Sequence, residues 1–115
     1  MKVDLDTSYR PYFQANVSEK FVNAMRGYFN SGENRLKNNY RLNKKIEEYK
    51  NFGYKDYTVE LHKKAMGWDV EYSLVAVKEG MKPQDYIILA KRNSFRKIVQ
   101  RFIEMRRGEF KSKFR

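Results

Sequence analysis

Residues 57–92, YTVELHKKAMGWDVEYSLVAVKEGMKPQDYIILAKR, decide the fold class of this chain. Apolar and polar side chains alternate over 57–63 and again over 68–78, the two-residue period of a strand with one buried face. MGWD between these runs can turn a hairpin, and DYIILAKR is β-branched and apolar after the turn EGMKPQ. We therefore expect three antiparallel strands. TVELHKKAMG also fits a short helix capped by Thr58 and Gly67, which leaves an alternative for the first strand.

Two helices are expected before the strands, after a short strand at 2–6 and a loop at 7–15. Asn16 followed by Glu19 has the spacing of a capping box, which predicts a helix start at Asn16, and NSG at 30–32 ends this helix with Gly32 left-handed. The second helix is expected over about 33–52, closed by Gly53. Its apolar side, expected to face the core, comprises Leu36, Tyr40, Leu42, Ile46 and Tyr49.

A third helix is expected after the strands, opening at Ser94 and ending near Gly108. One strongly apolar face follows the helical period and should pack on the sheet: Phe95, Ile98, Val99, Phe102 and Ile103. Phe110 and Phe114 lie among cations with no period that would bury them. The expected fold is α+β, with two N-terminal helices, a three-stranded antiparallel sheet and a C-terminal amphipathic helix on the sheet. Residues 1–107 would form one compact domain and residues 108–115 a basic tail.

Bulk composition fits one domain of 115 residues with a real core, since 41% of the residues are hydrophobic and 16% are aromatic. The chain has no cysteine, which excludes a disulfide framework and thiolate metal sites and fits a cytoplasmic protein. No apolar run approaches the ~20 residues of a membrane span, and the N-terminus lacks the apolar stretch of a signal peptide. We expect no membrane partner.

The net charge of +11 is concentrated in two segments. Residues 35–50 carry a net charge of +4 and residues 91–115 a net charge of +8, whereas the remaining segments are almost neutral. Such clustering is typical of a protein with an anionic partner. The second helix should present a basic stripe opposite its apolar side, and the last helix should point cations outward. The candidate nucleic-acid-binding residues are Lys37, Arg41, Lys44, Lys45, Arg92, Arg96, Lys97, Arg101, Arg106, Arg107, Lys111 and Lys113.

No catalytic constellation or cofactor motif is evident, which favours a non-enzymatic protein and leaves an enzyme as the alternative, and we expect no cofactor and no metal. His62 is the one histidine and has no acid–base partner that spacing identifies. The carboxylates are scattered, whereas a metal-dependent nuclease needs two or three that converge. A phosphate-binding glycine loop is also missing.

The β-β-β-α order over residues 57–107 resembles that of double-stranded-RNA-binding domains and of the three-stranded DNA-binding domains of some integrases, an analogy of fold alone. Over the whole chain, the element order is similar to that of ribosome-dependent mRNA interferase toxins. That resemblance implies metal-independent RNA cleavage, with Lys91, Arg92 and Tyr86 as candidate residues. A helix-turn-helix over the first two helices stays open, although the second helix is long for a recognition helix.

Three hypotheses follow. The first is a non-enzymatic nucleic-acid-binding protein, an accessory or regulatory factor of a phage or mobile element, which contacts phosphates through basic helix faces. The second is a protein-binding inhibitor of a nucleic-acid-processing enzyme, with an acidic protein surface as partner. The third is the mRNA interferase. DNA or RNA, and monomer or homodimer, stay open.

Overall fold

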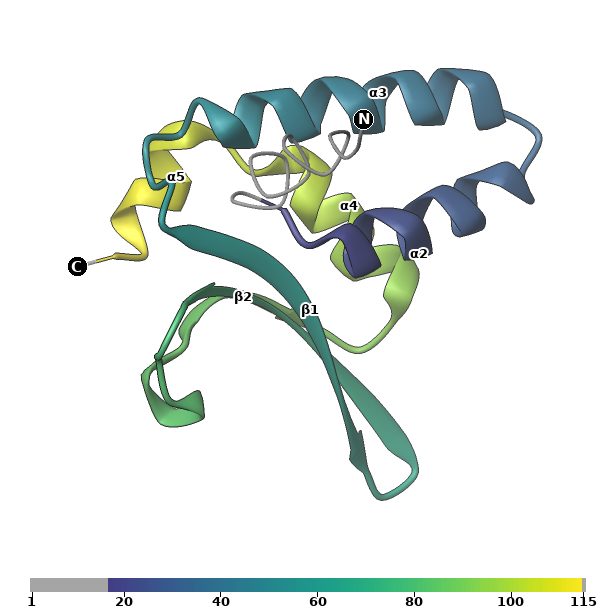
Figure 1. Ribbon diagram of the computed structural model, residues 1–115. Coiled ribbons are helices and arrows are strands. Elements are labelled where there is room, and N and C mark those ends of the chain that lie inside the picture. Colours follow the sequence, from purple (N-terminus) through teal and green to yellow (C-terminus); the bar gives the residue numbers. More distant parts are fainter. Residues whose placement is uncertain (1–16, 115) are drawn as a thin grey trace, which may run out of the picture.

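The computed structural model describes residues 17–114 as an α+β fold of helices packed on one three-stranded antiparallel sheet (Figure 1). The expected fold class is confirmed, and 57–66 is a strand rather than a helix. The strand expected at 2–6 and the loop expected at 7–15 lie outside the described residues. The elements in chain order are α2 (Glu19–Asn30), α3 (Arg35–Lys50), β1 (Tyr57–Met66), β2 (Asp69–Lys78), the short 3-10 helix η2 (Pro83–Asp85), β3 (Ile87–Arg92), α4 (Phe95–Glu104) and α5 (Arg107–Ser112).

The sheet has the order β1-β2-β3, and β1 and β2 are each longer than β3. β1 and β2 pair from Tyr57 opposite Lys78 to Met66 opposite Asp69, which leaves Gly67 and Trp68 as a two-residue turn. Gly67 has a φ of 65°, a conformation such turns require and that glycine adopts without strain. β3 pairs with β2 only as far as Tyr72. Beyond that pair the hairpin continues as a two-stranded ribbon that projects away from the helices (Figure 1).

A β-bulge in β3 determines which side chains face the helices. Leu74 pairs with Ala90 but Val75 pairs with Ile88, so Leu89 is an extra residue between them. Leu89 is buried in the core. The bulge reverses the alternation beyond it, and Arg92 therefore lies opposite Tyr72 on the helix side of the sheet, with Lys91 on the outer side.

The core lies between one face of the sheet and the helices, with Phe102 of α4 near its centre. The Phe102 ring stacks on Tyr49 of α3 at 4.4 Å and meets Phe21 of α2 edge-on at 5.2 Å. The expected apolar face of the last helix is confirmed, since Ile98, Val99 and Phe102 are buried and Phe95 and Ile103 pack against the core.

The start of α2 differs from the expectation at Asn16. Ser18 is the N-cap, and its Oγ accepts a hydrogen bond from the Phe21 N–H at 3.4 Å. The Ser18 N–H in turn donates to the Val59 oxygen at 2.8 Å, and Val17 forms a parallel bridge with Val59. The helix starts where the chain leaves the edge of β1, a tertiary contact that the capping-box spacing does not contain. Gly32 lacks the expected left-handed conformation, which Gly53 adopts after α3.

The expected core positions of Leu36 and Tyr40 are wrong. Their side chains are 79% and 66% exposed. At 3.6 residues per turn, the buried positions of α3 occupy an arc of about 100°, and Leu36 and Tyr40 project from the far side. The residues of that arc are Leu42, Lys45, Ile46 and Tyr49.

The C-terminal segment belongs to the core, contrary to the expectation of a tail in which Phe110 and Phe114 have no buried partner. Phe110 is buried against Phe52, and Phe114 stacks on Tyr54 with ring centroids 4.2 Å apart. The helix expected to be the last, α4, ends at Glu104. An extended backbone at Met105 and Arg106 then precedes α5. The sequence placed the helix end near Gly108, whereas Gly108 lies inside α5, and this second helix carries Phe110 onto the core.

We predict that Phe110→Ala lowers the free energy of unfolding by about 3–5 kcal/mol, because it empties a filled aromatic site. Denaturant unfolding followed by circular dichroism measures this. Lys111→Ala in the same helix is the control and should change the value by less than about 0.5 kcal/mol, since Lys111 is exposed. Equal effects of the two substitutions would show that α5 does not pack as described.

Candidate nucleic-acid interface

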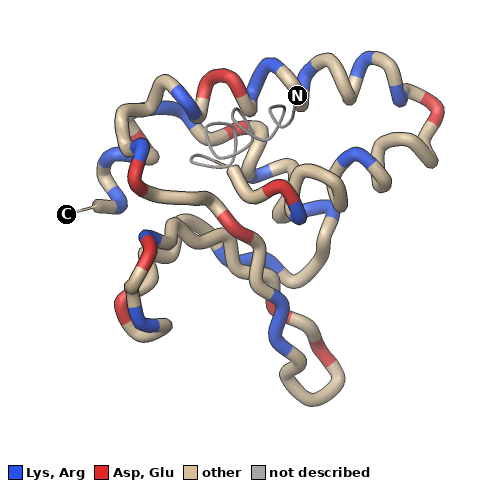
Figure 2. Tube along the Cα trace, viewed as in Figure 1, with Lys and Arg blue, Asp and Glu red and all other residues tan. Residues whose placement is uncertain are grey.

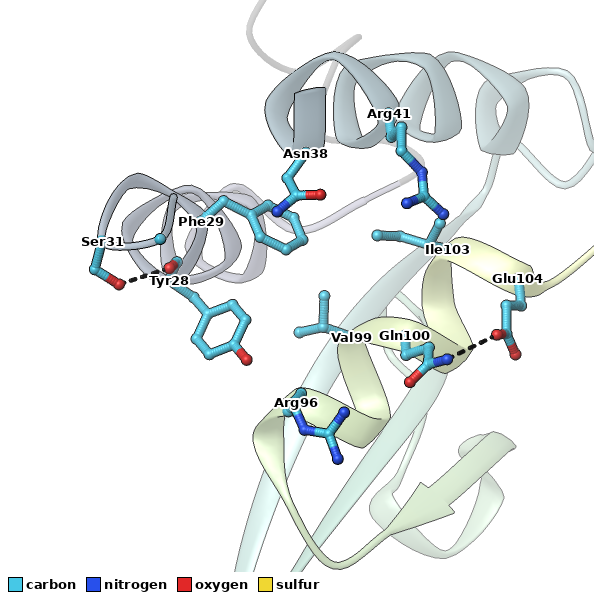
Figure 3. Close-up of a pocket in the computed structure, with 11 residues that line it drawn as sticks. Tyr28, Phe29, Ser31, Asn38, Arg41, Arg96, Val99, Gln100, Ile103 and Glu104 are labelled. Atoms are coloured by element: carbon cyan, nitrogen blue, oxygen red, sulfur yellow. Dashed lines mark hydrogen bonds between the residues drawn. The ribbon is translucent and has the colours of Figure 1, made fainter. Parts of the chain in front are cut away.

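A cleft of about 430 Å³ lies between the α2–α3 hairpin and α4 (Figure 3). Its apolar surface comes from Phe29, Val99 and Ile103, and Asn38 and Gln100 add amide groups. Both helix faces are brought together by the core beneath them, so residues far apart in the sequence share one concave surface. The cleft is lined by polar and charged groups as well as apolar ones, and its volume lies in the range of ligand sites.

Two of the predicted binding residues line this cleft. Arg41 lies on α3 and Arg96 in the first turn of α4, with Val99 and Gln100 between them (Figure 3). Both side chains are exposed, and neither guanidinium has a hydrogen-bond or ion-pair partner among residues 17–114. Guanidinium groups bind phosphate and carboxylate in a bidentate manner. The sequence predicted each residue separately, and the fold makes them one site.

An aromatic ring and one carboxylate complete the lining. Tyr28 of α2 is partly exposed at the edge of the cleft, with its ring 5.4 Å from that of Phe95. Glu104 is the carboxylate, and its Oε2 accepts a hydrogen bond from Gln100 Nε2 at 3.1 Å. The cleft thus combines an aromatic ring with two arginines that are not neutralised by an ion pair from the described residues.

The start of α4 lies beside the cleft and has the expected cap. The Ser94 Oγ accepts a hydrogen bond from the Lys97 N–H at 3.2 Å. Arg96 and Lys97 are exposed in this first turn, where unpaired backbone N–H groups also favour anions. Lys97 therefore adds to the charge near Arg96.

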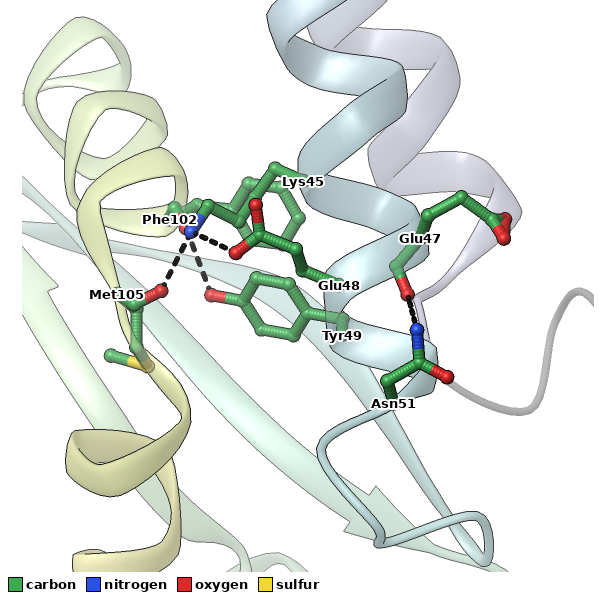
Figure 4. A network of polar contacts seen from close by, with 7 residues as sticks. All are labelled: Lys45, Glu47, Glu48, Tyr49, Asn51, Phe102 and Met105. Carbon is green, nitrogen blue, oxygen red and sulfur yellow. Dashed lines mark hydrogen bonds and ion pairs between the residues drawn. The ribbon is translucent and has the colours of Figure 1, made fainter.

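Lys45 does not lie on the expected outward stripe. It is only 8% exposed, and its Nζ donates to the Met105 oxygen and to Glu48 Oε1, each at 2.9 Å (Figure 4). Its position on the buried arc of α3 explains this, because the side chain reaches the end of α4. The lysine is part of the structure that holds the two helices together.

Tyr49, one turn after Lys45, contacts the same end of α4. Its hydroxyl donates to the Phe102 oxygen at 2.9 Å. Burial raises the pKa of Tyr49 well above its ordinary value, so the hydroxyl stays a protonated donor. Lys45 and Tyr49 thus satisfy two carbonyls that the α4 C-terminus leaves without helical partners.

Arg101 also differs from its expected outward position. Its side chain is 18% exposed and forms an ion pair with Glu109, which ties α4 to α5. The other C-terminal candidates are exposed on or next to α5, beside the C-terminal end of α3 and away from the cleft (Figures 1 and 2). They are Arg106, Arg107, Lys111 and Lys113. Lys37 and Lys44 are exposed on α3.

The residues suggested by the interferase resemblance are not brought together. Lys91 lies 3.9 Å from Glu71 on the outer side of the sheet, whereas Arg92 lies on the helix side. Tyr86 precedes β3 and its ring contacts His62 at 5.5 Å. At about 3.3 Å per strand residue, Tyr86 and Arg92 are roughly 20 Å apart.

His62 has a partner that the sequence reasoning missed. Its Nε2 lies 2.8 Å from Glu60 Oε1. The i, i+2 spacing on one face of a strand was the available signal. The pair lines a different cavity, between β1 and the start of α2, which it shares with Lys20.

Two features are absent from residues 17–114. No group of three or more His, Asp or Glu side chains there could hold a metal ion. No helix of this part of the chain is both long and apolar enough to cross a membrane.

Comparison with known proteins finds no matching family model, no matching curated protein and no matching solved structure. The cleft and its charges are therefore the basis for a functional proposal.

We predict that Lys45→Ala and Lys44→Ala, which change adjacent lysines, have very different effects on the free energy of unfolding. Lys45→Ala should lower the free energy of unfolding by about 1.5–3 kcal/mol, because it removes charged hydrogen bonds at a buried carbonyl. Lys44→Ala should change it by less than about 0.5 kcal/mol, since Lys44 is exposed. Denaturant unfolding of both variants checks this, and a destabilised Lys44→Ala with an unchanged Lys45→Ala would contradict the described helix face.

Proposed function

We propose that this protein binds nucleic acid without acting as an enzyme, as an accessory or regulatory factor of a phage or mobile element. The observation that carries the binding proposal is that Arg41 and Arg96, unpaired among the described residues, line one cleft together with the partly exposed ring of Tyr28. The mobile-element role is suggested by the small size and the high Lys, Asn and Tyr content of the chain.

The chemistry of the cleft suits a nucleotide unit. Two guanidinium groups can hold phosphate oxygens, the apolar surface can cover a sugar or base, and Tyr28 offers a ring for stacking. Lys37, Lys44 and Lys97 extend the positive surface along the two helices. Lys45 and Arg101 have no part in this surface, because both are committed to internal contacts.

A non-enzymatic role is supported by the separation of charged groups. The His62–Glu60 pair is an acid–base pair, but it lines a different cavity from Arg41 and Arg96. General acid–base catalysis by this pair would require it within reach of the bound phosphate. The cleft is better suited to holding a phosphate than to cleaving its ester.

A second candidate is the inhibitor that binds the acidic surface of a nucleic-acid-processing enzyme. Leu36 and Tyr40 support it, because they are exposed on α3 close to Lys37, Arg41 and Lys44. A helix face that combines large apolar and basic side chains is suited to a protein interface. This partner would use the outside of α3 as well as the cleft.

We predict that Arg41→Ala and Arg96→Ala each weaken nucleic-acid binding and make the log–log salt slope shallower by about 1, the loss of one phosphate contact. Fluorescence anisotropy with labelled single-stranded DNA, duplex DNA and RNA at several salt concentrations measures this. Lys82→Ala is the control, because it removes an equal charge from the β2–β3 loop, and its slope should match that of the unchanged protein.

Binding with the same salt slope in all three variants would show that the cleft is not the contact site. If no nucleic acid binds at near-physiological salt, the proposal is wrong. A pull-down that recovers an acidic protein, and loses it in Tyr40→Ala, would then support the inhibitor.

A further inference from the structure

The ribbon beyond Tyr72 ends in the most exposed aromatic side chain of the described residues. Trp68, the one tryptophan of the chain, is fully exposed in the two-residue turn, and Met66 beside it is half exposed. Tryptophan in water is unusual unless a partner covers it. The paired strands on either side hold the turn in place, so the side chain is presented at a defined point of the molecule.

The helix side of this ribbon carries cations and no carboxylate. The cross-strand pairs Lys63–Tyr72 and Ala65–Val70 lie on this side, and Arg92 lies opposite Tyr72. The Lys63 Nζ is 5.9 Å from the centre of the Tyr72 ring. The outer side is different, because the cations there are balanced by Asp69 and Glu71. Residues 63–72 are therefore neutral overall, but Lys63 and the neighbouring Arg92 lie on the helix side, whereas both carboxylates lie on the outer side.

Aromatic rings connect this side of the ribbon to the cleft. Tyr72 contacts Phe95 at 6.0 Å, and Phe95 contacts Tyr28 at 5.4 Å, where Tyr28 lines the cleft. Each of the three rings is at least partly exposed. Trp68, Tyr72, Phe95 and Tyr28 together are called the aromatic strip below. Lys63, Arg92 and Arg96 accompany it from the ribbon to the cleft.

We infer that the aromatic strip binds a single strand of nucleic acid, with Trp68 stacked on an unpaired base and the phosphates following the cations to the cleft. The inference rests on the proposed function. Aromatic rings stack on bases only where the bases are unpaired, and a basic path with interleaved aromatic rings is the common arrangement of single-strand-binding surfaces. The positive charge of the helix side is complementary to a polyanion. Trp68 lies at one end of the path that such a strand would follow.

The test uses Trp68 as its own reporter, because it is the one tryptophan. A single-stranded thymidine 16-mer should quench its fluorescence, and a thymidine tetramer of the same chemistry, able to fill only the cleft, should quench it far less. Trp68→Ala should weaken binding of the 16-mer by roughly 5- to 150-fold, the equivalent of about 1–3 kcal/mol. The salt slope should not change, since tryptophan carries no charge.

Two controls separate stacking from other effects. Tyr40→Ala removes an exposed aromatic ring outside the strip and should leave the affinity for the 16-mer unchanged. Trp68→Phe keeps a ring and should retain most of the affinity. Thermal unfolding of Trp68→Ala should match that of the unchanged protein, because the side chain is exposed.

The outcomes for this inference and for the proposed function are distinguishable. If the 16-mer binds with a steep salt slope, but Trp68 fluorescence and the affinity of Trp68→Ala do not change, the strip is overturned and the proposed function stands. If a duplex 16-mer quenches Trp68 at least as strongly as the single strand, the single-strand assignment is overturned in favour of a wedge between base pairs. If no nucleic acid binds, both proposals fall.

Discussion

The hydrogen bonds from Lys45 and Tyr49 to the end of α4 are the constraint on which the functional surface depends. They join two helices at carbonyl groups that α4 cannot satisfy internally, and the Tyr49 ring stacks on Phe102 beside them. A purely apolar contact would let the helices slide, whereas buried hydrogen bonds require a defined register. Arg41 lies one turn before Lys45, so the register that satisfies Met105 also sets where Arg41 meets α4.

A second constraint acts in the sheet. The extra residue at Leu89 fills the core and at the same time reverses the face on which the following residues lie. Arg92 consequently shares the helix side with Tyr72, and the chain then enters α4 with Arg96 near the cleft. One inserted residue therefore places charge on the same side of the molecule as the helices. Bulges commonly reorient side chains next to functional sites in this way.

Much of the fold could be predicted from the sequence, because its strands and its last helix have strong local patterns. The two-residue alternation over 57–63 and 68–78 and the Ser94 cap are local properties, and the structure has both. The errors share a different origin. Lys45 and Arg101 look like surface cations until their partners, Met105 and Glu109, are known, and these partners arrive through tertiary packing.

The candidate site was predictable only as separate residues. Arg41 and Arg96 stood out by charge, but no spacing indicates that α3 and α4 bring them to one cleft. Trp68 begins the alternating run over 68–78, so the pattern gives it a strand position, and its full exposure in the turn is known only from the structure. Charge clustering therefore leads only to the proposal of an anionic partner, while the arrangement of the surface needed the packed helices and the bulge.

The single bridge between Val17 and Val59 has a consequence for how this protein behaves in crowded solution. Among the described residues, that bridge covers only the beginning of the free edge of β1, and the strand continues to Met66. Exposed strand edges recruit other strands, and Lys63 and Lys64 lie on this stretch, where charge normally deters such pairing. Lys63 and Lys64 project from opposite faces of this stretch, so charge on both faces opposes the pairing of protein copies along the strand edge.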